Sequence, residues 1–286
     1  MGAMALDATQ RKASSRLGAH ANLLHGWIYF SPAAAEEYAA LGLTDEQTYF
    51  ASRAAPMGEV SAAVVTATFF NFHPDRVEQA IPRAWRQAPP ADVQAARMRG
   101  AARILHGSVG DALDADSARA ANEVAEAICD AVSYEGRPLA GANREVELPD
   151  DDLLLALWQR LTVIREWRGD AHVAVLTAAP VDAVEALVLH AGIGVMSKEA
   201  LTLTRGWSED EWAAGVERLR SRGLTESDGS LTDAGAAYRD EIEQRTDDVS
   251  WPLVAAVGED AVHRFIDGLK PLREALLASG VFPRLR

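Results

Sequence analysis

The sequence predicts an all-α fold, a helical bundle carrying one small β-hairpin, and three observations lead to this prediction. Helix-initiating residues recur along the chain, and hydrophobic residues make up 48% of its 286 positions. A long segment after Pro149 is apolar on nearly every helical face. Only one stretch, centred on Asp228-Gly229, has the turn residues that favour a hairpin. A chain of this length and composition can bury a substantial core.

Capping residues predict the helices of the N-terminal part. Ser31 before Pro32 predicts a helix start, because serine is a favoured N-cap and proline is tolerated in the first turn. Thr44 and Gln47 have the spacing of a capping box. The apolar stretch from Val60 to Phe72 contains strand-favouring residues, but its length and alanines favour a buried helix. Further helices are predicted over residues 7–24, 75–85, 90–107 and 117–129, and a loop over residues 135–148.

The segment that begins at Pro149 predicts the central helix. Three aspartates follow this proline, and acidic residues stabilise the positive end of a helix dipole. A helix that is apolar on all faces is usually buried, so we expect this helix, or a pair broken near Gly169, to form the spine. The predicted division is an N-terminal helical part (1–148), a central buried helix (149–179), a winged-helix-like module (180–247) and a C-terminal helical tail (248–286).

Three predicted helices, a hairpin and a further helix have the element order of a winged helix-turn-helix. They are expected over residues 181–191, 197–204, 208–222, 225–232 and 232 onward. The run from Glu217 to Gly235 resembles MarR-type regulators through its Gly-Leu, Asp-Gly and Leu-Thr-x-x-Gly motifs. This resemblance implies a fold and, by analogy with those regulators, a homodimer.

The whole chain is also similar to an actinobacterial helix-turn-helix family that is labelled MarR-like. The motifs that carry this similarity are His25-Gly-Trp27, Arg53-Ala-Ala-Pro56, Phe69-Phe-Asn-Phe72 with Pro74, Arg165-Glu-Trp-Arg-Gly-Asp-Ala-His172, and Arg205-Gly-Trp207. The similarity implies a fold and no particular activity.

Charge argues against direct binding of DNA. The formal net charge of −14 repels phosphate backbones and anionic membranes at long range. In helix-turn-helix docking, the N-terminal part of the recognition helix meets the base edges. Here that part is Ser208-Glu-Asp-Glu-Trp212, which presents three consecutive acids.

Other features of the sequence predict a cytoplasmic protein. The single cysteine, Cys129, allows no intramolecular disulfide, and its apolar surroundings favour a buried thiol over a catalytic one. There is no apolar run of 18 residues and no signal-peptide core, so no membrane contact is expected. The sequence has no zinc motif, dinucleotide fingerprint or phosphate loop, so we expect no metal and assign no cofactor.

The strongest candidate site lies on the central helix. Arg165, Arg168 and His172 follow the spacing i, i+3, i+7, which places them on one stripe, and Asp170 lies beside them. Two interpretations remain open. The group is either an internal ion-pair network, because a buried arginine must be paired, or a wall that recognises an anion, with His172 donating or shuttling a proton.

Two aromatic clusters are candidates for the same site. His25 with Trp27, and Phe72 with His73, are either plain core or further walls of a cavity for a flat, acidic, partly apolar ligand such as an aromatic or polyketide acid. A porphyrin is a further possibility, with His25, His73 or His172 as an axial ligand.

These features together favour a protein that binds a small anionic or aromatic molecule on a repurposed regulator fold, without direct DNA binding. Two alternatives remain: a MarR-like transcriptional regulator, and an enzyme that acts on an aromatic or polyketide acid or uses a porphyrin.

Overall fold

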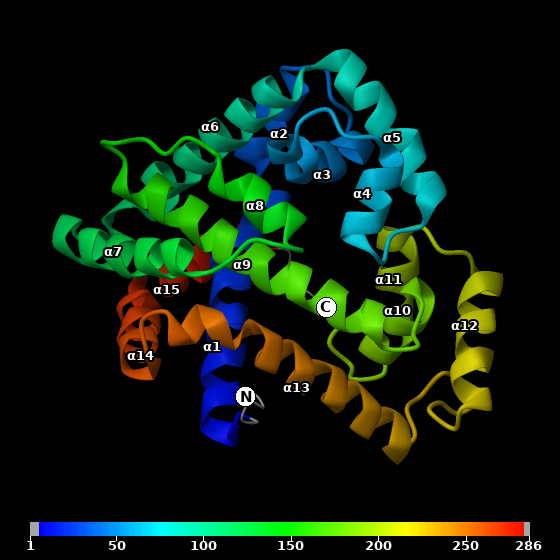
Figure 1. Cartoon of the computed structure of the whole chain (residues 1–286). Coiled ribbons are helices and arrows are strands. Elements are labelled where there is room, and N and C mark those ends of the chain that lie inside the picture. The colour runs from blue at the N-terminus through cyan, green and yellow to red at the C-terminus, as the bar shows by residue number, and fades with distance from the viewer. Residues whose placement is uncertain (1–5, 283–286) are drawn as a thin grey trace.

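The computed structural model describes residues 6–282, and helices make up most of this part of the chain (Figure 1). The first half contains α1 (Ala8–Gly26), α2 (Pro32–Ala39), α3 (Asp45–Ala54), α4 (Ala62–Phe69), α5 (Pro74–Gln87), α6 (Pro90–Ser108), α7 (Ala115–Ala131) and α8 (Pro138–Arg144). The second half contains α9 (Leu153–Ala178), α10 (Ala183–Ala191), α11 (Lys198–Arg205), α12 (Glu209–Ser221), α13 (Asp233–Ala255), α14 (Glu259–Gly268) and α15 (Lys270–Ala278). Short 3₁₀ turns lie at Trp27–Phe30, Ala55–Met57 and Gly110–Ala112.

The capping signals at Ser31 and Thr44 start helices where they were expected. The Ser31 hydroxyl accepts a hydrogen bond from the Ala34 amide at 3.2 Å, which starts α2. Thr44 and Gln47 form the expected capping box of α3, in which the Gln47 carboxamide oxygen accepts from the Thr44 amide at 2.9 Å. The apolar stretch before Phe72 forms the helix α4, although only one face of it is buried.

The loop that we expected over residues 135–148 is wrong, because this segment contains α8. Its proline, Pro138, occupies the first turn, where the missing amide donor costs nothing. Leu139 and Ala140 are buried against the rest of the molecule, so tertiary packing stabilises a helix that its glycine does not favour.

Helix α9 runs without a break through Gly169 and lies between helices from both halves of the chain (Figure 1). It begins at Leu153, where the Asp152 carboxylate accepts from the Leu155 amide at 3.0 Å, four residues after the proline that was expected to start it. Most of its side chains are buried, including those of Trp158 and Ile164.

The predicted β-hairpin is wrong, and with it the winged form of the module. Thr225 and Leu231 form an isolated antiparallel bridge, and residues 6–282 contain no strand. The physical reason is length. Gly223, at φ 73°, ends the turn after α12, and Thr232 already caps α13, so the two sides of the turn are too short for strands of three residues or more. The all-α part of the prediction is right.

Buried side chains form three hydrophobic cores. The largest core joins α1, α6, α7, α9 and the C-terminal helices, and together with the small aromatic core of α3, α4 and α5 it forms the part that we call the body. The second core lies within α10, α11 and α12, which we call the helix-turn-helix module, and it includes Val175 of α9 and Ile242 of α13. The third core is small and aromatic, and lies between α3, α4 and α5. Helices α9 and α13 therefore contribute to the cores of both the body and the module.

No single helix among residues 6–282 is long and apolar enough to cross a membrane. Helices α9 and α10 pass that test of length and composition only as a pair, and they are bent by 109° at their junction.

Candidate functional site

A cavity of about 360 Å³ lies between the body and the helix-turn-helix module. Side chains from α1, α9, α10, α11 and α13 line it, so it is bounded by helices that are far apart in the sequence. The polar lining residues are Asn22, Asn71, Arg165, Arg168, His172, His190, Arg205, Arg239 and Glu243. The apolar lining residues are Leu176, Ala186, Leu187, Leu189, Met196, Leu201 and Ile242. This mixture of apolar wall and convergent charged groups is typical of a small-molecule site.

Three of the predicted site residues share this cavity. Arg165, Arg168 and His172 lie along one stripe of α9 and all contribute to the lining. Gly18 of α1 makes room for this stripe, since a Cβ built there would lie 2.1 Å from the Cδ of Arg168. The position of the Arg168 side chain against α1 therefore depends on the absence of a side chain at position 18.

The charges at the α13 end of the cavity are balanced. The Arg168 guanidinium donates to Asp247 at 2.9 Å and to Glu243 at 3.2 Å. Arg239 lies 2.8 Å from the other Glu243 oxygen, so two arginines face two carboxylates. His172 bonds to the Thr246 hydroxyl here at 2.9 Å, and burial lowers its pKa to about 4, so its imidazole is neutral near pH 7.

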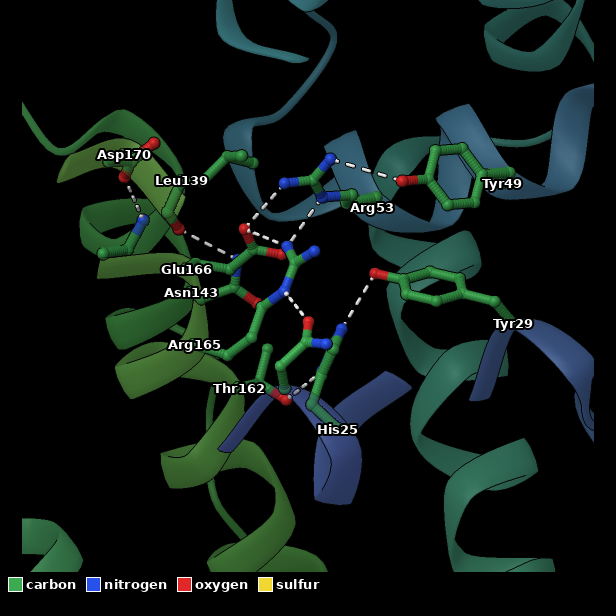
Figure 2. Close-up of polar contacts among 12 residues, drawn as sticks. His25, Tyr29, Tyr49, Arg53, Leu139, Asn143, Thr162, Arg165, Glu166 and Asp170 are labelled. Carbon is green, nitrogen blue, oxygen red and sulfur yellow. Dashed lines mark hydrogen bonds and ion pairs between the residues drawn. The ribbon is translucent and has the colours of Figure 1, made fainter. Parts of the chain in front are cut away.

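The opposite end of the cavity, near α11, carries an excess of positive charge. Glu166 is fully buried and accepts from Arg53 through both oxygens, at 3.1 and 2.9 Å (Figure 2). Arg165 also lies 2.7 Å from one of these oxygens. Burial opposes ionisation of Glu166, but these arginines hold its pKa well below its usual range. One carboxylate is therefore shared by two guanidinium groups.

Arg205 adds a third guanidinium group at this end. It is the last residue of α11, and no carboxylate of residues 6–282 lies within ion-pair distance of it. Its guanidinium carbon lies 4.6 Å from the centroid of the Phe72 ring, and its buried Nε donates to no group of the described chain. Burial, together with the nearby arginines, lowers the pKa of Arg205. Arg205 is half-buried, and its other guanidinium nitrogens include one that donates to the Thr204 hydroxyl at 3.1 Å. Its buried Nε has no acceptor and its charge has no carboxylate partner, so the hydrogen bonding at this end of the cavity is incomplete.

The other predicted site residues do not line the cavity. The fully buried His25 bonds to Thr162 and Tyr29, each at 2.9 Å, and burial lowers its pKa well below its usual range (Figure 2). Trp27 is core, with its ring centroid 5.8 Å from that of Trp158. Asp170 points away from the cavity and accepts from the Ala140 amide at 3.0 Å.

The second aromatic candidate pair, Phe72 and His73, has two separate positions. Phe72 belongs to the third core and reaches the cavity only through Arg205, which lies over its ring. His73 caps α5 and lies 3.1 Å from the Glu211 carboxylate of α12, so it joins the body to the module. The three histidines that were candidate axial ligands thus lie on separate elements, and each already has a hydrogen-bond partner.

Sequence reasoning missed Arg205, Arg239, His190 and Glu243 as lining residues. Arg205 belongs to the Arg205-Gly-Trp207 motif, which the sequence analysis used only for resemblance. The spacing of four residues between Arg239 and Glu243 was a signal for an ion pair on one helix face, but nothing in the sequence pointed that face at α9.

The helices of the module have the arrangement of a helix-turn-helix. Gly206, at φ 85°, makes the left-handed turn after α11, and the capping box of Ser208 and Glu211 starts α12. The body holds this turn, because the Trp207 indole donates to the Asn71 carbonyl at 3.0 Å and the His73 amide donates to the Arg205 carbonyl at 2.9 Å.

Fold and cavity together define a helix-turn-helix protein with an internal cationic site. The chain belongs to the helix-turn-helix family whose sequence model matches residues 14–283. No curated protein and no solved structure matches it.

Proposed function

We propose that this protein is a ligand-responsive regulator of the helix-turn-helix class, and that its ligand is a small organic anion with an apolar part. The observation that carries the proposal is the position of Arg205. It is a half-buried guanidinium without a carboxylate partner, at the junction of the module and the body, and it lines a cavity with an apolar wall. An anionic group in the cavity would supply the counter-charge that Arg205 lacks and an acceptor for its buried Nε.

The position of the cavity suggests how a ligand would affect the module. Arg165 belongs to α9 of the body, whereas Arg205 ends α11, directly before the turn that leads to α12. A ligand that contacts both residues would tie α11 to the body and lower the free energy of the ordered module. A ligand can shift the conformation only through such a difference in affinity between two states.

Thermal unfolding tests the ligand part of the proposal. We expect benzoate, phthalate or phenyl phosphate to raise Tm relative to sodium chloride at equal ionic strength. A ligand at about a hundred times its Kd stabilises the native state by about 2.7 kcal/mol. Arg205→Met keeps the side-chain volume, removes the charge and should abolish the shift. If none of the three anions raises Tm of the unaltered protein, the proposal fails.

The output of the module is the second part of the proposal. Membership of the family favours a DNA-binding regulator, and the MarR-like relationship and a homodimer remain predictions within that class. The exposed face of α12 favours a second candidate function, a ligand sensor that does not contact DNA. Glu209 and Asp210 are exposed at its N-terminus, and Glu217 pairs with Arg220 on the same face. Acidic side chains there repel phosphates and offer few base contacts.

A mobility-shift titration distinguishes the two outputs. A regulator should shift DNA from the neighbourhood of its own gene, with an affinity that falls steeply as salt is raised, because each phosphate contact releases counterions. Adding the anion found by thermal unfolding should change that affinity. A protein that binds the anion and shifts no DNA at low salt is a sensor of the second kind.

A further inference from the structure

We infer that the ligand of this cavity carries a doubly charged head group, and that this head binds between Arg165 and Arg205. The inference rests on the proposed function, because it names the chemical class of ligand for the same cavity. Its support is the uneven distribution of charge between the two ends of the cavity.

At the α13 end, the protein supplies its own counterions. Arg168 and Arg239 face Glu243 and Asp247, so a ligand anion placed there would compete with two carboxylates. The binding of an anion at this end would displace existing ion pairs and gain little net free energy.

At the α11 end, the compensation is incomplete. Glu166 directs both oxygens to Arg53, which leaves Arg165 with a share of one oxygen and Arg205 with none. The cavity-lining Arg165 and Arg205 therefore bring two positive charges that no protein carboxylate fully neutralises. A singly charged head would leave one of them uncompensated at low dielectric, whereas a doubly charged head would neutralise both.

The pKa of a neighbouring tyrosine is shifted by the same excess of positive charge. Tyr49 lies on α3 behind Arg53, whose guanidinium donates to its hydroxyl at 3.4 Å (Figure 2). Burial alone would raise the pKa of Tyr49, but Arg53 and Arg205 lower it below its ordinary value. At Tyr49 the positive charge of these arginines therefore outweighs the effect of burial on the pKa.

The geometry of the cavity indicates the rest of the ligand. The Phe72 ring contacts the Arg205 guanidinium by a cation–π interaction, which favours this position of the side chain. Leu187, Leu201 and Ile242 provide an apolar wall for the remainder of the molecule. A phosphate monoester or a dicarboxylate on an apolar body has this chemistry, and both present two negative charges to paired guanidinium groups.

Matched ligands isolate the charge of the head group. Phenyl phosphate and phenyl sulfate share a ring and a tetrahedral head, and at about pH 8 the phosphate is doubly charged because its second pKa is near 6. Phthalate and benzoate give the same comparison for carboxylates. Isothermal titration calorimetry at fixed ionic strength should give a Kd at least about tenfold lower for the dianion of at least one pair, which corresponds to about 1.4 kcal/mol.

Two substitutions and one control test the placement of the head. Arg205→Met should remove the preference for the dianion, and Arg205→Lys, which keeps the charge, should retain part of it. Arg264→Ala replaces an exposed arginine of α14 outside the cavity lining and should leave both affinities unchanged. Circular dichroism and Tm of each variant report whether it is folded.

The outcomes separate this inference from the proposed function. Equal affinity for the dianion and the monoanion of both pairs would overturn the doubly charged head while leaving an anion site in place. A preference that Arg205→Met leaves intact would overturn the placement between Arg165 and Arg205. Absence of binding by all four compounds, together with no rise in Tm, would overturn the proposed function itself.

Discussion

Arg205, the last residue of α11, lies with its guanidinium carbon 4.6 Å from the centroid of the Phe72 ring, so a residue of the module is held by the aromatic core of the body. This contact joins two sequence motifs that are more than a hundred residues apart. It also places Arg205, a cation without a carboxylate partner, in the lining of the same cavity as Arg165, so this end of the cavity carries uncompensated positive charge.

The buried ion pair of Glu166 should be important for stability. Glu166→Gln leaves Arg53 and Arg165 without a full counter-charge in the interior, and breaking such a buried pair costs about 3–5 kcal/mol. Glu217→Gln is a matched control, since the pair of Glu217 with Arg220 is exposed, is screened by solvent and contributes little to stability. Urea unfolding of both variants checks this prediction, and equal losses in the two variants would refute it.

Substitution of Gly18 should displace the Arg168 side chain, which lines the cavity. In Gly18→Ala the new Cβ would lie 2.1 Å from the Cδ of Arg168, so this side chain must move away from Asp247. Because the clash is with the flexible end of Arg168, that side chain can shift, and the cost is the loss of its contact with Asp247, about 1 kcal/mol relative to Gly26→Ala. Gly26→Ala in the same helix has nothing within 4 Å of the new Cβ, so comparing the two variants cancels the higher helix propensity of alanine. A Gly18→Ala protein as stable as Gly26→Ala would contradict the position of the Arg168 side chain against α1.

The buried Asp170 should make stability depend on pH. Burial raises its pKa to about 7, although the Ala140 amide opposes this, and Glu166, Arg53 and Arg137 are its charged neighbours. A folded-state pKa above the unfolded value means that the native state binds more protons between about pH 4 and pH 7. The contribution of Asp170 is therefore fully present below about pH 4 and is lost as the pH rises through about 7.

Asp170→Asn isolates this effect. The asparagine oxygen can still accept from the Ala140 amide, but it does not ionise, so the variant should lose less stability than the unaltered protein between about pH 5 and pH 8. The measurement is the free energy of unfolding at several pH values. His172 acts with the opposite sign, because its lowered pKa removes stability as the pH falls from about 6.5 through about 4, but it is present in both proteins and its contribution cancels from the comparison. Parallel curves for the two proteins above about pH 5 would rule out a raised pKa at Asp170.

The hydrogen bond that joins the Trp207 indole of the module to the Asn71 carbonyl of the body should stabilise α11 and α12. Trp207→Phe keeps an aromatic side chain, although a smaller one, and removes the indole donor to the Asn71 carbonyl, a bond whose loss costs about 1 kcal/mol. Amide hydrogen exchange should then be faster in α11 and α12, while α7 keeps its protection. If exchange rises equally in α7, the substitution acts on the whole fold rather than on the contact between Trp207 and Asn71.

Local signals allowed the helix starts to be predicted, whereas tertiary contacts decided the rest. The capping pattern of Thr44 was sufficient because the hydrogen bonds of an N-cap are made within three residues. The hairpin prediction failed because Asp228-Gly229 specifies a turn, but the helices on either side leave no length for strands. The expected loop contains α8 because Leu139 is buried by partners distant in the sequence.

The candidate site was predictable only where one helix carries it. The stripe of Arg165, Arg168 and His172 follows from helical periodicity. Both arginines take part in ion pairs with carboxylates, and the interpretation of the stripe as a wall that recognises an anion stays a prediction. Arg205 could not be assigned to the site, because its position depends on how α11 packs beside α9. Nothing in a single sequence determines that packing.

The sharing of α9 and α13 between two cores limits how the protein can move. α13 alone has 23 residues, a rod about 35 Å long, and both helices pass from the core of the body into that of the module. An independent rotation of the module would have to bend both α9 and α13, so the two shared helices oppose a hinge motion between the module and the body. A ligand in the cavity would instead act by changing the local order of the short helices α10, α11 and α12, which pack against α9 and α13.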